Sequence, residues 1–151
     1  MTLAQLIRAA KHVYLAGNGG SAANAMHVAN DLISVGIKAH ALTGDISTLT
    51  AIGNDFGYGT VFSGQLRVFA EPGDLLIVLS GSGQSANIIH ALSAAKDIGI
   101  DSVAIIGAYN ANTPAENLAT YTISQGADMQ AAEEAQLVIG HEAWRALKGK
   151  V

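Results

Sequence analysis

The sequence predicts an α/β protein, a three-layer αβα sandwich with a five-stranded parallel sheet in the middle. Short apolar segments alternate with longer segments of helical composition along the chain. One apolar segment, residues 74–79, is continuous, as in strands that are buried on both faces. Alternation of this kind implies right-handed crossovers, which bring the strands into one parallel sheet with helices on both faces.

Each element follows from a local pattern. The apolar segments predicted as strands are, in chain order, residues 13–16, 38–42, 74–79, 102–106 and 121–124. The segments predicted as helices are residues 21–35, 46–51, 60–70, 85–98 and 129–148. Glycines in residues 53–57 are expected to break the second helix, and residues 110–116 are predicted as a loop. With 50% hydrophobic side chains in 151 residues, we expect one domain over residues 1–151.

Two loops rich in Gly, Ser and Asn follow predicted strands. Residues 17–21 follow the first strand and residues 80–85 follow the third. Such a loop before a helix lets backbone N–H groups surround an anion at the positive helix end, and serine hydroxyls add donors. In a parallel sheet both loops lie at the carboxyl edge, where ligands bind near the reversal of strand order. The two loops therefore predict a site for a phosphorylated small molecule.

A dinucleotide site is an alternative interpretation of the first loop. Residues 17–22 satisfy the G-x-G-x-x-A form of the dinucleotide fingerprint, and Asp45 could contact a ribose. The second loop favours a phosphorylated small molecule, because three serines in six residues suit a terminal phosphate monoester better than a pyrophosphate. These serines are Ser80, Ser82 and Ser85.

Composition narrows the class of protein. The formal net charge is −4 and the eight Lys and Arg residues are scattered, which argues against nucleic acid or an anionic membrane as partner. The chain has no cysteine, so disulfides and thiolate metal sites are excluded. No apolar run approaches the ~18 residues of a membrane span, and no signal-peptide pattern is found at the N-terminus. We expect a cytoplasmic enzyme or binding domain.

Four ordered motifs resemble a known family. They are residues 16–21, 25–27, 53–57 and 80–87. Together they are similar to the SIS (sugar isomerase) domain, closest to its phosphoheptose isomerase branch, and the resemblance extends over residues 13–147. It implies a flavodoxin-like fold, conversion of sedoheptulose 7-phosphate to D-glycero-D-manno-heptose 7-phosphate, a Zn²⁺ ion and a homotetramer. Another ketose phosphate is also compatible with these loops.

The resemblance also implies roles for single residues. The serine loop would hold the phosphate, and the other motifs would line the sugar. The implied substrate-binding residues are Asn18, Gly19, Gly20, Ser21, Asp55, Ser80, Gly81, Ser82 and Ser85. The family's base is a Glu four residues after a helix His, where this chain has Asp31, and its acid corresponds to His141. Glu133 replaces a family Gln eight residues before that acid, and Ser34 and Val35 replace a Gly-Arg pair.

The side chains themselves suit this chemistry. His27 and Asp31 are four residues apart on a predicted helix, so both project from one face. Glu133 and His141 are eight apart, roughly 80° around the last helix. Imidazole suits zinc and carboxylate oxygens complete a tetrahedral shell, so these four residues are predicted metal ligands. We expect Asp31 as base and His141 as acid, acting from opposite sides of the sugar. Asp31 is one methylene shorter than Glu, and such a misplacement can cost about a hundredfold in rate.

A SIS domain without catalysis is the second hypothesis. Some relatives with this fold act as partner-binding proteins, including one that associates with a bacterial replication initiator. Those relatives lack the His of the last helix, so His141 favours an enzyme. Three other histidines match no motif and are given no role: His12, His40 and His90.

Low charge predicts a covered surface. Charged residues make up 13% of the chain, against ~25% in typical soluble domains. We expect a homo-oligomer, a dimer or the family's tetramer, packed through the helices at 21–35 and 129–148. The last helix would present Leu137, Val138, Trp144 and Leu147. Residues 1–11 offer only about three helical turns before the first strand, where family members carry about two helices.

Overall fold

The structure is a computed structural model, which describes residues 1–149. Its five-stranded sheet has the order β2-β1-β3-β4-β5, and all neighbouring strands are parallel. In chain order the strands are Val13–Gly17 (β1), Ala39–Ala41 (β2), Leu75–Ser80 (β3), Asp101–Ile106 (β4) and Tyr121–Ser124 (β5). Each strand overlaps the segment predicted for it, so the predicted sheet is confirmed.

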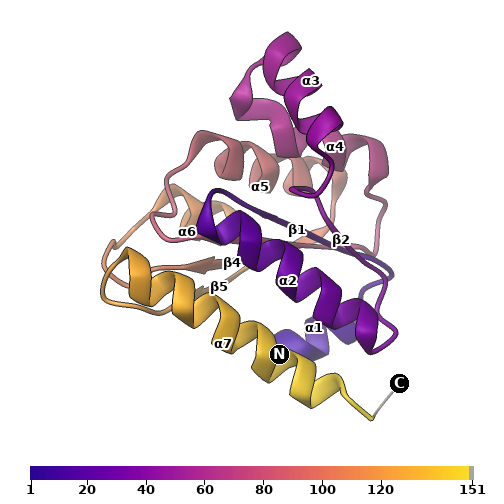
Figure 1. Ribbon diagram of the computed structural model, residues 1–151, viewed down its shortest axis with the longest axis vertical. Coiled ribbons are helices and arrows are strands. Elements are labelled where there is room, and N and C mark those ends of the chain that lie inside the picture. The colour runs from indigo at the N-terminus through magenta and orange to yellow at the C-terminus, as the bar shows by residue number, and fades with distance from the viewer. Residues whose placement is uncertain (150–151) are drawn as a thin grey trace.

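Helices cover both faces of the sheet (Figure 1). One face carries α1 (Leu3–Ala9), α2 (Gly20–Ser34) and α7 (Met129–Leu147). The other carries α4 (Val61–Phe69), α5 (Ala86–Ile98) and α6 (Pro114–Leu118). α3 (Ile46–Phe56) and the 3-10 helix η1 (Tyr58–Thr60) pack next to α4 at the end of the molecule farthest from α7 (Figure 1). The predicted three-layer sandwich is therefore confirmed.

Successive strand residues divide the core between the two faces. In β1, Leu15 packs with α2 and α7, whereas Tyr14 and Ala16 pack with α4 and α5. In β3, Ile77 and Val78 are divided in the same way. This alternation follows from the twofold period of a strand. Because both faces are covered, β3 needs apolar side chains on both, which explains its unbroken apolar sequence from Leu75 to Leu79.

The strand order reverses between β1 and β3. β1 leads through α2 to β2 on one side, and β3 leads through α5 to β4 on the other. Sheets of this kind bind ligands in the crevice outside the carboxyl ends of the strands at such a reversal. The two glycine-rich loops, residues 17–21 and 80–85, begin at these two strand ends. The fold therefore brings both predicted loops to one crevice.

The helix predicted over residues 46–51 is longer in the structure, and of the residues 53–57 predicted to break it only Gly57 does so. α3 continues through Gly53 and ends at Gly57, whose φ of +91° is one that glycine adopts easily. One glycine inside a helix costs only ~1 kcal/mol, which the rest of the helix can offset. The start of α3 is fixed by Asp45, whose carboxylate accepts the first backbone N–H groups at 3.0 and 3.2 Å.

The loop predicted at residues 110–116 contains the start of α6. Thr113 and Glu116 form a reciprocal capping box, in which each side chain accepts from the other residue's backbone N–H (2.7 and 3.3 Å). Pro114 occupies the first turn, where a missing N–H costs nothing. The prediction missed this five-residue helix because it is too short to show a periodic apolar face.

α7 packs along α2 within one chain (Figure 1). Leu147, predicted on the outer surface of the last helix, is fully buried in the core of this layer. Val138 does face outward. Within residues 1–149, none of the helices combines the length and the apolar composition that crossing a bilayer requires.

Candidate active site

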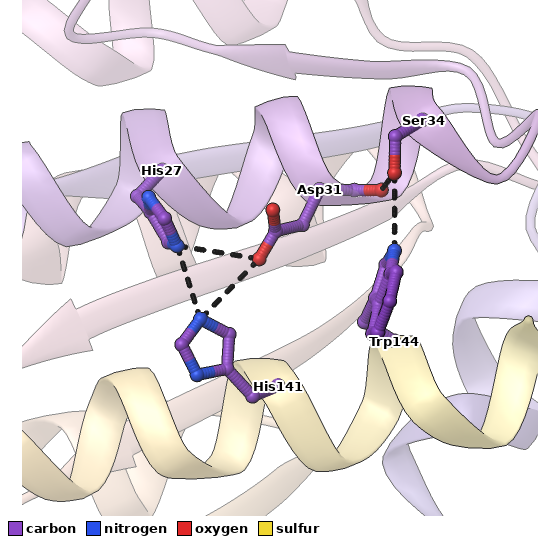
Figure 2. Close-up of polar contacts among 5 residues, drawn as sticks. All are labelled: His27, Asp31, Ser34, His141 and Trp144. Atoms are coloured by element: carbon purple, nitrogen blue, oxygen red, sulfur yellow. Dashed lines mark hydrogen bonds and ion pairs between the residues drawn. The ribbon is translucent and has the colours of Figure 1, made fainter.

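Three polar side chains meet between α2 and α7 (Figure 2). His27 and Asp31 project from one face of α2, as their spacing predicts, and His141 projects toward them from α7. His27 Nε2 lies 3.0 Å from His141 Nε2. Asp31 Oδ2 lies 3.3 Å from His27 Nε2 and 3.5 Å from His141 Nε2. We call this group the His-Asp-His triangle. Asp31 and His141 are thus neighbours within one chain, rather than groups on opposite sides of a ligand.

The His-Asp-His triangle has the dimensions of part of a metal site. Tetrahedral coordination with bonds of ~2.0–2.2 Å separates ligand atoms by ~3.3–3.6 Å. The observed separations of 3.0, 3.3 and 3.5 Å are close to these values. The His27 side chain is 49% exposed and the His141 side chain 39%, so solvent reaches the triangle. Three protein ligands beside an accessible position are typical of catalytic metal centres, and these residues can hold a divalent ion.

The close approach of α2 and α7 depends on Gly140. A Cβ atom at this position would lie 2.5 Å from Cγ2 of Val28, so a side chain has no room where the two helices touch. Val28 and Gly140 are the sequence neighbours of His27 and His141. This contact therefore sets the distance between the two imidazoles. Sequence reasoning missed Gly140, although a glycine inside a helical segment is itself a signal of close packing.

A second polar contact joins the same helices near the end of α2 (Figure 2). The indole Nε1 of Trp144 donates to Ser34 Oγ at 3.0 Å. The Ser34 hydroxyl donates to the backbone carbonyl of Asp31 at 2.6 Å. Ser34 and Trp144, neither of them predicted as site residues, therefore link α7 to the turn of α2 that carries Asp31.

Glu133, predicted as a fourth metal ligand, is not among the converging side chains. Its carboxylate packs against Gly20, where a Cβ atom would lie 2.5 Å from Oε2. Gly20 is the first residue of α2, so the carboxylate lies at the positive end of that helix. Eight residues of α7 separate Glu133 from His141, about 12 Å along the helix axis. Glu133 therefore lies beside the first glycine loop and apart from the triangle.

The first glycine loop exposes its backbone. Gly19 and Gly20 are exposed, and Gly19 adopts φ +55° immediately before α2. Gly17 has no room for a side chain, because a Cβ atom would lie 2.5 Å from the carbonyl oxygen of Ser21. The half-buried Asn18 bonds across the crevice to Asn87 in the first turn of α5. Asn87 was part of a recognised motif but was not predicted as a site residue.

A buried amide network supports this loop from below. Gln136 of α7 donates from Nε2 to Ser21 Oγ (3.1 Å), and its Oε1 accepts from Asn24 Nδ2 (2.9 Å). Ser21 is itself buried, so the structure assigns it a supporting position rather than an exposed one. Gln136 was not predicted, because its partners lie more than a hundred residues away in sequence.

The serines of the second loop have different environments. Ser80 is buried and its Oγ accepts from the backbone N–H of Gly83 (3.1 Å), which shapes the loop. Ser82 and Ser85 are half-buried, and Ser85 is the residue before the first turn of α5. Ser82 Oγ accepts from the backbone N–H of Gln84 (3.2 Å), and the Ser85 side chain does not cap α5. The first N–H groups of a helix lack intrahelical partners, so those of α5 remain available. This arrangement suits an anion such as phosphate.

Two side chains pack closely against Gly81. A Cβ atom there would collide with Met129 Sδ and the Tyr109 hydroxyl. Burial, followed by the negative charges of Asp128 and Glu133, raises the pKa of Tyr109. Tyr109 therefore stays a neutral donor, and its hydroxyl donates to Met129 Sδ (3.6 Å).

Two predicted acidic residues occupy other positions. Asp55 is exposed near the end of α3, where its carboxylate accepts from Asn54 Nδ2 (2.9 Å). The contact from this segment to the first glycine loop comes instead from Tyr58, whose hydroxyl donates to Asn18 Oδ1 (3.2 Å). Asp45, the residue that a dinucleotide ribose would need, caps α3.

Similar proteins are known. The sequence profile of the SIS domain family matches residues 1–107. A phosphoheptose isomerase of Sulfurimonas denitrificans is 50% identical over 108 residues, which are 68% of this chain and 55% of that protein. One of Aneurinibacillus thermoaerophilus is 43% identical over 136 residues, which are 85% of this chain and 68% of that protein. The structure of phosphoheptose isomerase GmhA from Neisseria gonorrhoeae matches with TM-score 0.88 at 32% identity, over 96% of this chain and 80% of that one. The chain thus spans little more than half the length of the Sulfurimonas relative.

Proposed function

This chain belongs to the SIS domain family, within its phosphoheptose isomerase branch, and on that premise we propose that it isomerises a seven-carbon sugar phosphate. The substrate would be sedoheptulose 7-phosphate and the product D-glycero-D-manno-heptose 7-phosphate. The observation that carries the proposal is the His-Asp-His triangle, which offers a proton acceptor and a proton donor 3.5 Å apart. The two glycine-rich loops at the carboxyl edge of the sheet support a phosphorylated ligand.

Asp31 would act as the base and His141 as the acid. Asp31 would remove a proton from C1 of the ketose while His141 donates a proton from Nε2 to the oxygen on C2. The resulting enediol then becomes the aldose in a second step. The hydroxyl on C1 loses its proton, and a proton is added to carbon C2. Because Asp31 Oδ2 and His141 Nε2 are 3.5 Å apart, both groups would act on the same side of the sugar. His27, 3.3 Å from the same carboxylate oxygen, would orient Asp31.

The same three side chains would hold a divalent ion, for which we propose Zn²⁺. With an ion bound, His141 Nε2 would be a ligand without a proton, and the positive charge of the ion would take the place of the imidazole as acid. Imidazole and carboxylate ligands with these separations suit zinc. A bound ion would supply positive charge that stabilises the enediolate oxygens. Three protein ligands suffice for a catalytic site, so the proposal does not require Glu133 in the shell.

The phosphate would bind at the start of α5. Ser82 and Ser85 would donate from their hydroxyls, and the first N–H groups of α5 would add further donors. Asn18, Gly19 and Gly20 would contact the sugar along the other loop. The supporting residues Ser21, Ser80 and Gly81 would keep the two loops in shape, and contact between Asp55 and the sugar stays a prediction.

We also propose a homo-oligomer that works in the cytoplasm. Exposed apolar side chains on the outer faces of α2 and α7 support an interface there: Met26, Ile33 and Val138. A charged sugar phosphate does not cross a bilayer unaided, which supports a cytoplasmic location for an enzyme that uses it.

The decisive experiment is incubation with sedoheptulose 7-phosphate after chelation, with and without added Zn²⁺, followed by measurement of the aldose. We expect turnover that depends on the metal. His141→Asn should abolish isomerisation and leave sugar-phosphate binding intact. His40→Asn, at an exposed position of β2 outside the triangle, is the matched control and should keep its activity.

Absence of turnover at every metal loading would reject the enzyme. Binding of the sugar phosphate under those conditions would support a SIS domain that binds its ligand without chemistry. The shorter side chain of Asp31, in place of the family's Glu, is the feature that would explain this outcome.

A further inference from the structure

We propose that Asn87 and Tyr58 are positioning residues, which fix the amide of Asn18 so that it can only donate a hydrogen bond to the bound sugar. The inference rests on the proposed function, because it states which hydrogen bonds the same binding site can make: Asn18 donates to the sugar and does not accept from it. The family resemblance implies that Asn18 contacts the sugar, and it implies no role for the two residues that hold Asn18. Their contacts decide which atoms of Asn18 remain available.

Asn18 and Asn87 face each other across the point where the strand order reverses. Asn18 follows β1, and Asn87 lies in the first turn of α5, which follows β3. Each side chain donates from Nδ2 to the Oδ1 of the other, and both distances are 2.8 Å. Asn87 is 3% exposed, so water competes little for these bonds. The pair thus links the two glycine-rich loops directly.

Tyr58 adds a third hydrogen bond to this pair. Its hydroxyl donates to Asn18 Oδ1 at 3.2 Å, although the Tyr58 side chain is 64% exposed. The segment that carries Tyr58 is docked on α5 by His90, whose Nδ1 lies 2.8 Å from the carbonyl oxygen of Gly59. A carbonyl oxygen only accepts, so the imidazole is the donor. A Cβ atom on Gly59 would lie 3.3 Å from the His90 ring, and glycine therefore allows this close docking.

Counting hydrogen-bond donors and acceptors shows which group of the Asn18 side chain is left for the ligand. A primary amide has two N–H donors and one oxygen with two lone pairs. Both lone pairs of Asn18 Oδ1 are occupied, one by Asn87 and one by Tyr58, and one of its N–H groups is used by Asn87. One N–H remains. Asn18 would therefore bind a sugar oxygen that accepts, and the bond would strengthen where negative charge develops in the reaction.

The Tyr58 hydroxyl is the part of this arrangement that can be removed without disturbing the core. Tyr58→Phe frees one lone pair of Asn18, so the amide can also accept from a sugar hydroxyl and loses its fixed polarity. We expect kcat/KM for sedoheptulose 7-phosphate to fall about 3- to 10-fold, the size of one neutral hydrogen bond, with an unchanged unfolding temperature.

Tyr14→Phe is the matched control. It also removes one tyrosine hydroxyl bond, that to the backbone carbonyl of Phe69 (3.1 Å), away from the loops. We expect it to lower the unfolding temperature and to leave kcat/KM unchanged.

A double-mutant cycle separates positioning from general support. In an Asn18→Ala background the target of Tyr58 is gone, so Tyr58→Phe should change the residual kcat/KM by a factor near one. The same loss in both backgrounds would show that Tyr58 acts elsewhere and would overturn the proposal. If the protein binds sedoheptulose 7-phosphate without turnover, the same factors are measured on Kd.

Side-chain amide NMR tests the pair without catalysis. In the ligand-free protein the Nδ2 protons that join Asn18 and Asn87 should exchange slowly with water, and Tyr58→Phe should speed the exchange. Slow exchange in an inactive protein would support the positioning residues while the proposed function fails. Fast exchange in the unmodified protein would overturn this inference whatever the activity.

Discussion

At the scale of single residues, Gly140 keeps α7 close to α2. The Cγ2 atom of Val28 lies where a side chain at position 140 would begin, and each of the two residues is next to a histidine of the triangle. A methyl group added here must push the helices apart or move Val28. Either change shifts His141 relative to His27 and Asp31, so stability and activity are coupled at this position.

Gly140→Ala is therefore expected to lower the free energy of unfolding by about 1–3 kcal/mol, as overpacking does, and to reduce turnover and metal affinity. Denaturant unfolding and a zinc titration measure the two effects. Gly64→Ala in α4 is the control. A Cβ atom at position 64 would lie 3.5 Å from Cδ1 of Ile52, which is an ordinary van der Waals distance. Adding Val28→Ala should restore part of the activity. Full stability and activity in Gly140→Ala would contradict this account of the triangle.

The serines differ in what they should contribute to binding. Ser82→Ala combined with Ser85→Ala should weaken sugar-phosphate binding by several kcal/mol, given ~1.5–3 kcal/mol for each hydrogen bond to a charged group. Calorimetric titration with the sugar phosphate measures the loss. Ser93→Ala, farther along α5, should bind normally. Unchanged affinity in the double variant would show that the phosphate does not bind at this loop.

At the scale of elements, none of the side chains of α3 is fully buried, although Leu49 and Ile52 pack half-buried against the core. The cap at its N-terminus therefore matters for this helix. Hydrogen bonds from the hydroxyls of Thr48 and Ser47, and then from the backbone, lower the pKa of Asp45 from 3.8 to about 2. A carboxylate whose pKa is lower in the folded state stabilises that state above its unfolded pKa. This contribution is lost as pH falls from about 4 toward 2.

Asp45→Asn should keep a capping oxygen and remove this pH dependence, whereas Asp45→Ala should loosen α3 at every pH. Hydrogen exchange of the α3 amides between pH 2 and pH 6 measures both effects. Equal protection in the Ala variant and the unmodified protein would show that α3 does not depend on its cap.

The elements show where sequence patterns are sufficient. The strands could be predicted because burial on both faces demands unbroken apolar runs between turn residues. The extent of α3 could not be predicted in this way. The free-energy cost of one glycine at position 53 is small enough for the N-terminal cap and the neighbouring helical turns to offset it. α6 is specified by a capping box and a proline, which are local signals that hydrophobic periodicity does not detect.

At the scale of the whole molecule, the outer faces of α2 and α7 are expected to be covered by a second copy. Val138→Glu would place a charge at a position that is 51% exposed in the single chain. We expect sedimentation to show an oligomer of at least two chains for the unmodified protein and a smaller species for this variant. Dilution of the unmodified protein should lower its activity and its stability together.

Val68→Glu on α4 is the control, because this more exposed position lies on the other side of the sheet. It should leave the oligomer intact. A stable, active monomer of the unmodified protein at micromolar concentration would contradict the expected assembly.

The candidate site was predictable only as far as single elements allow. Helical spacing places His27 and Asp31 together, and family resemblance alone suggested His141, because its approach depends on how α7 packs on α2. Glu133 was expected with them, yet a helix that brings His141 to the triangle carries Glu133 about 12 Å away along its axis. The pair of Asn18 and Asn87 joins positions 69 residues apart, which no local pattern reveals.

The place of His27 on its helix has a consequence for substrate size. Gly20, at the first glycine loop, and His27 are seven residues apart on α2, about 10 Å at 1.5 Å per residue. The rise per residue of an α-helix is constant, so the distance between these two positions is fixed. Under the proposed function, a ligand whose phosphate is bound at the start of α5 and whose sugar passes the first glycine loop must extend along this interval before its carbonyl end reaches His27. Three- and four-carbon sugar phosphates bound at the glycine-rich loops would be too short to reach His27. The fold itself would therefore select substrates by the length of their carbon chain.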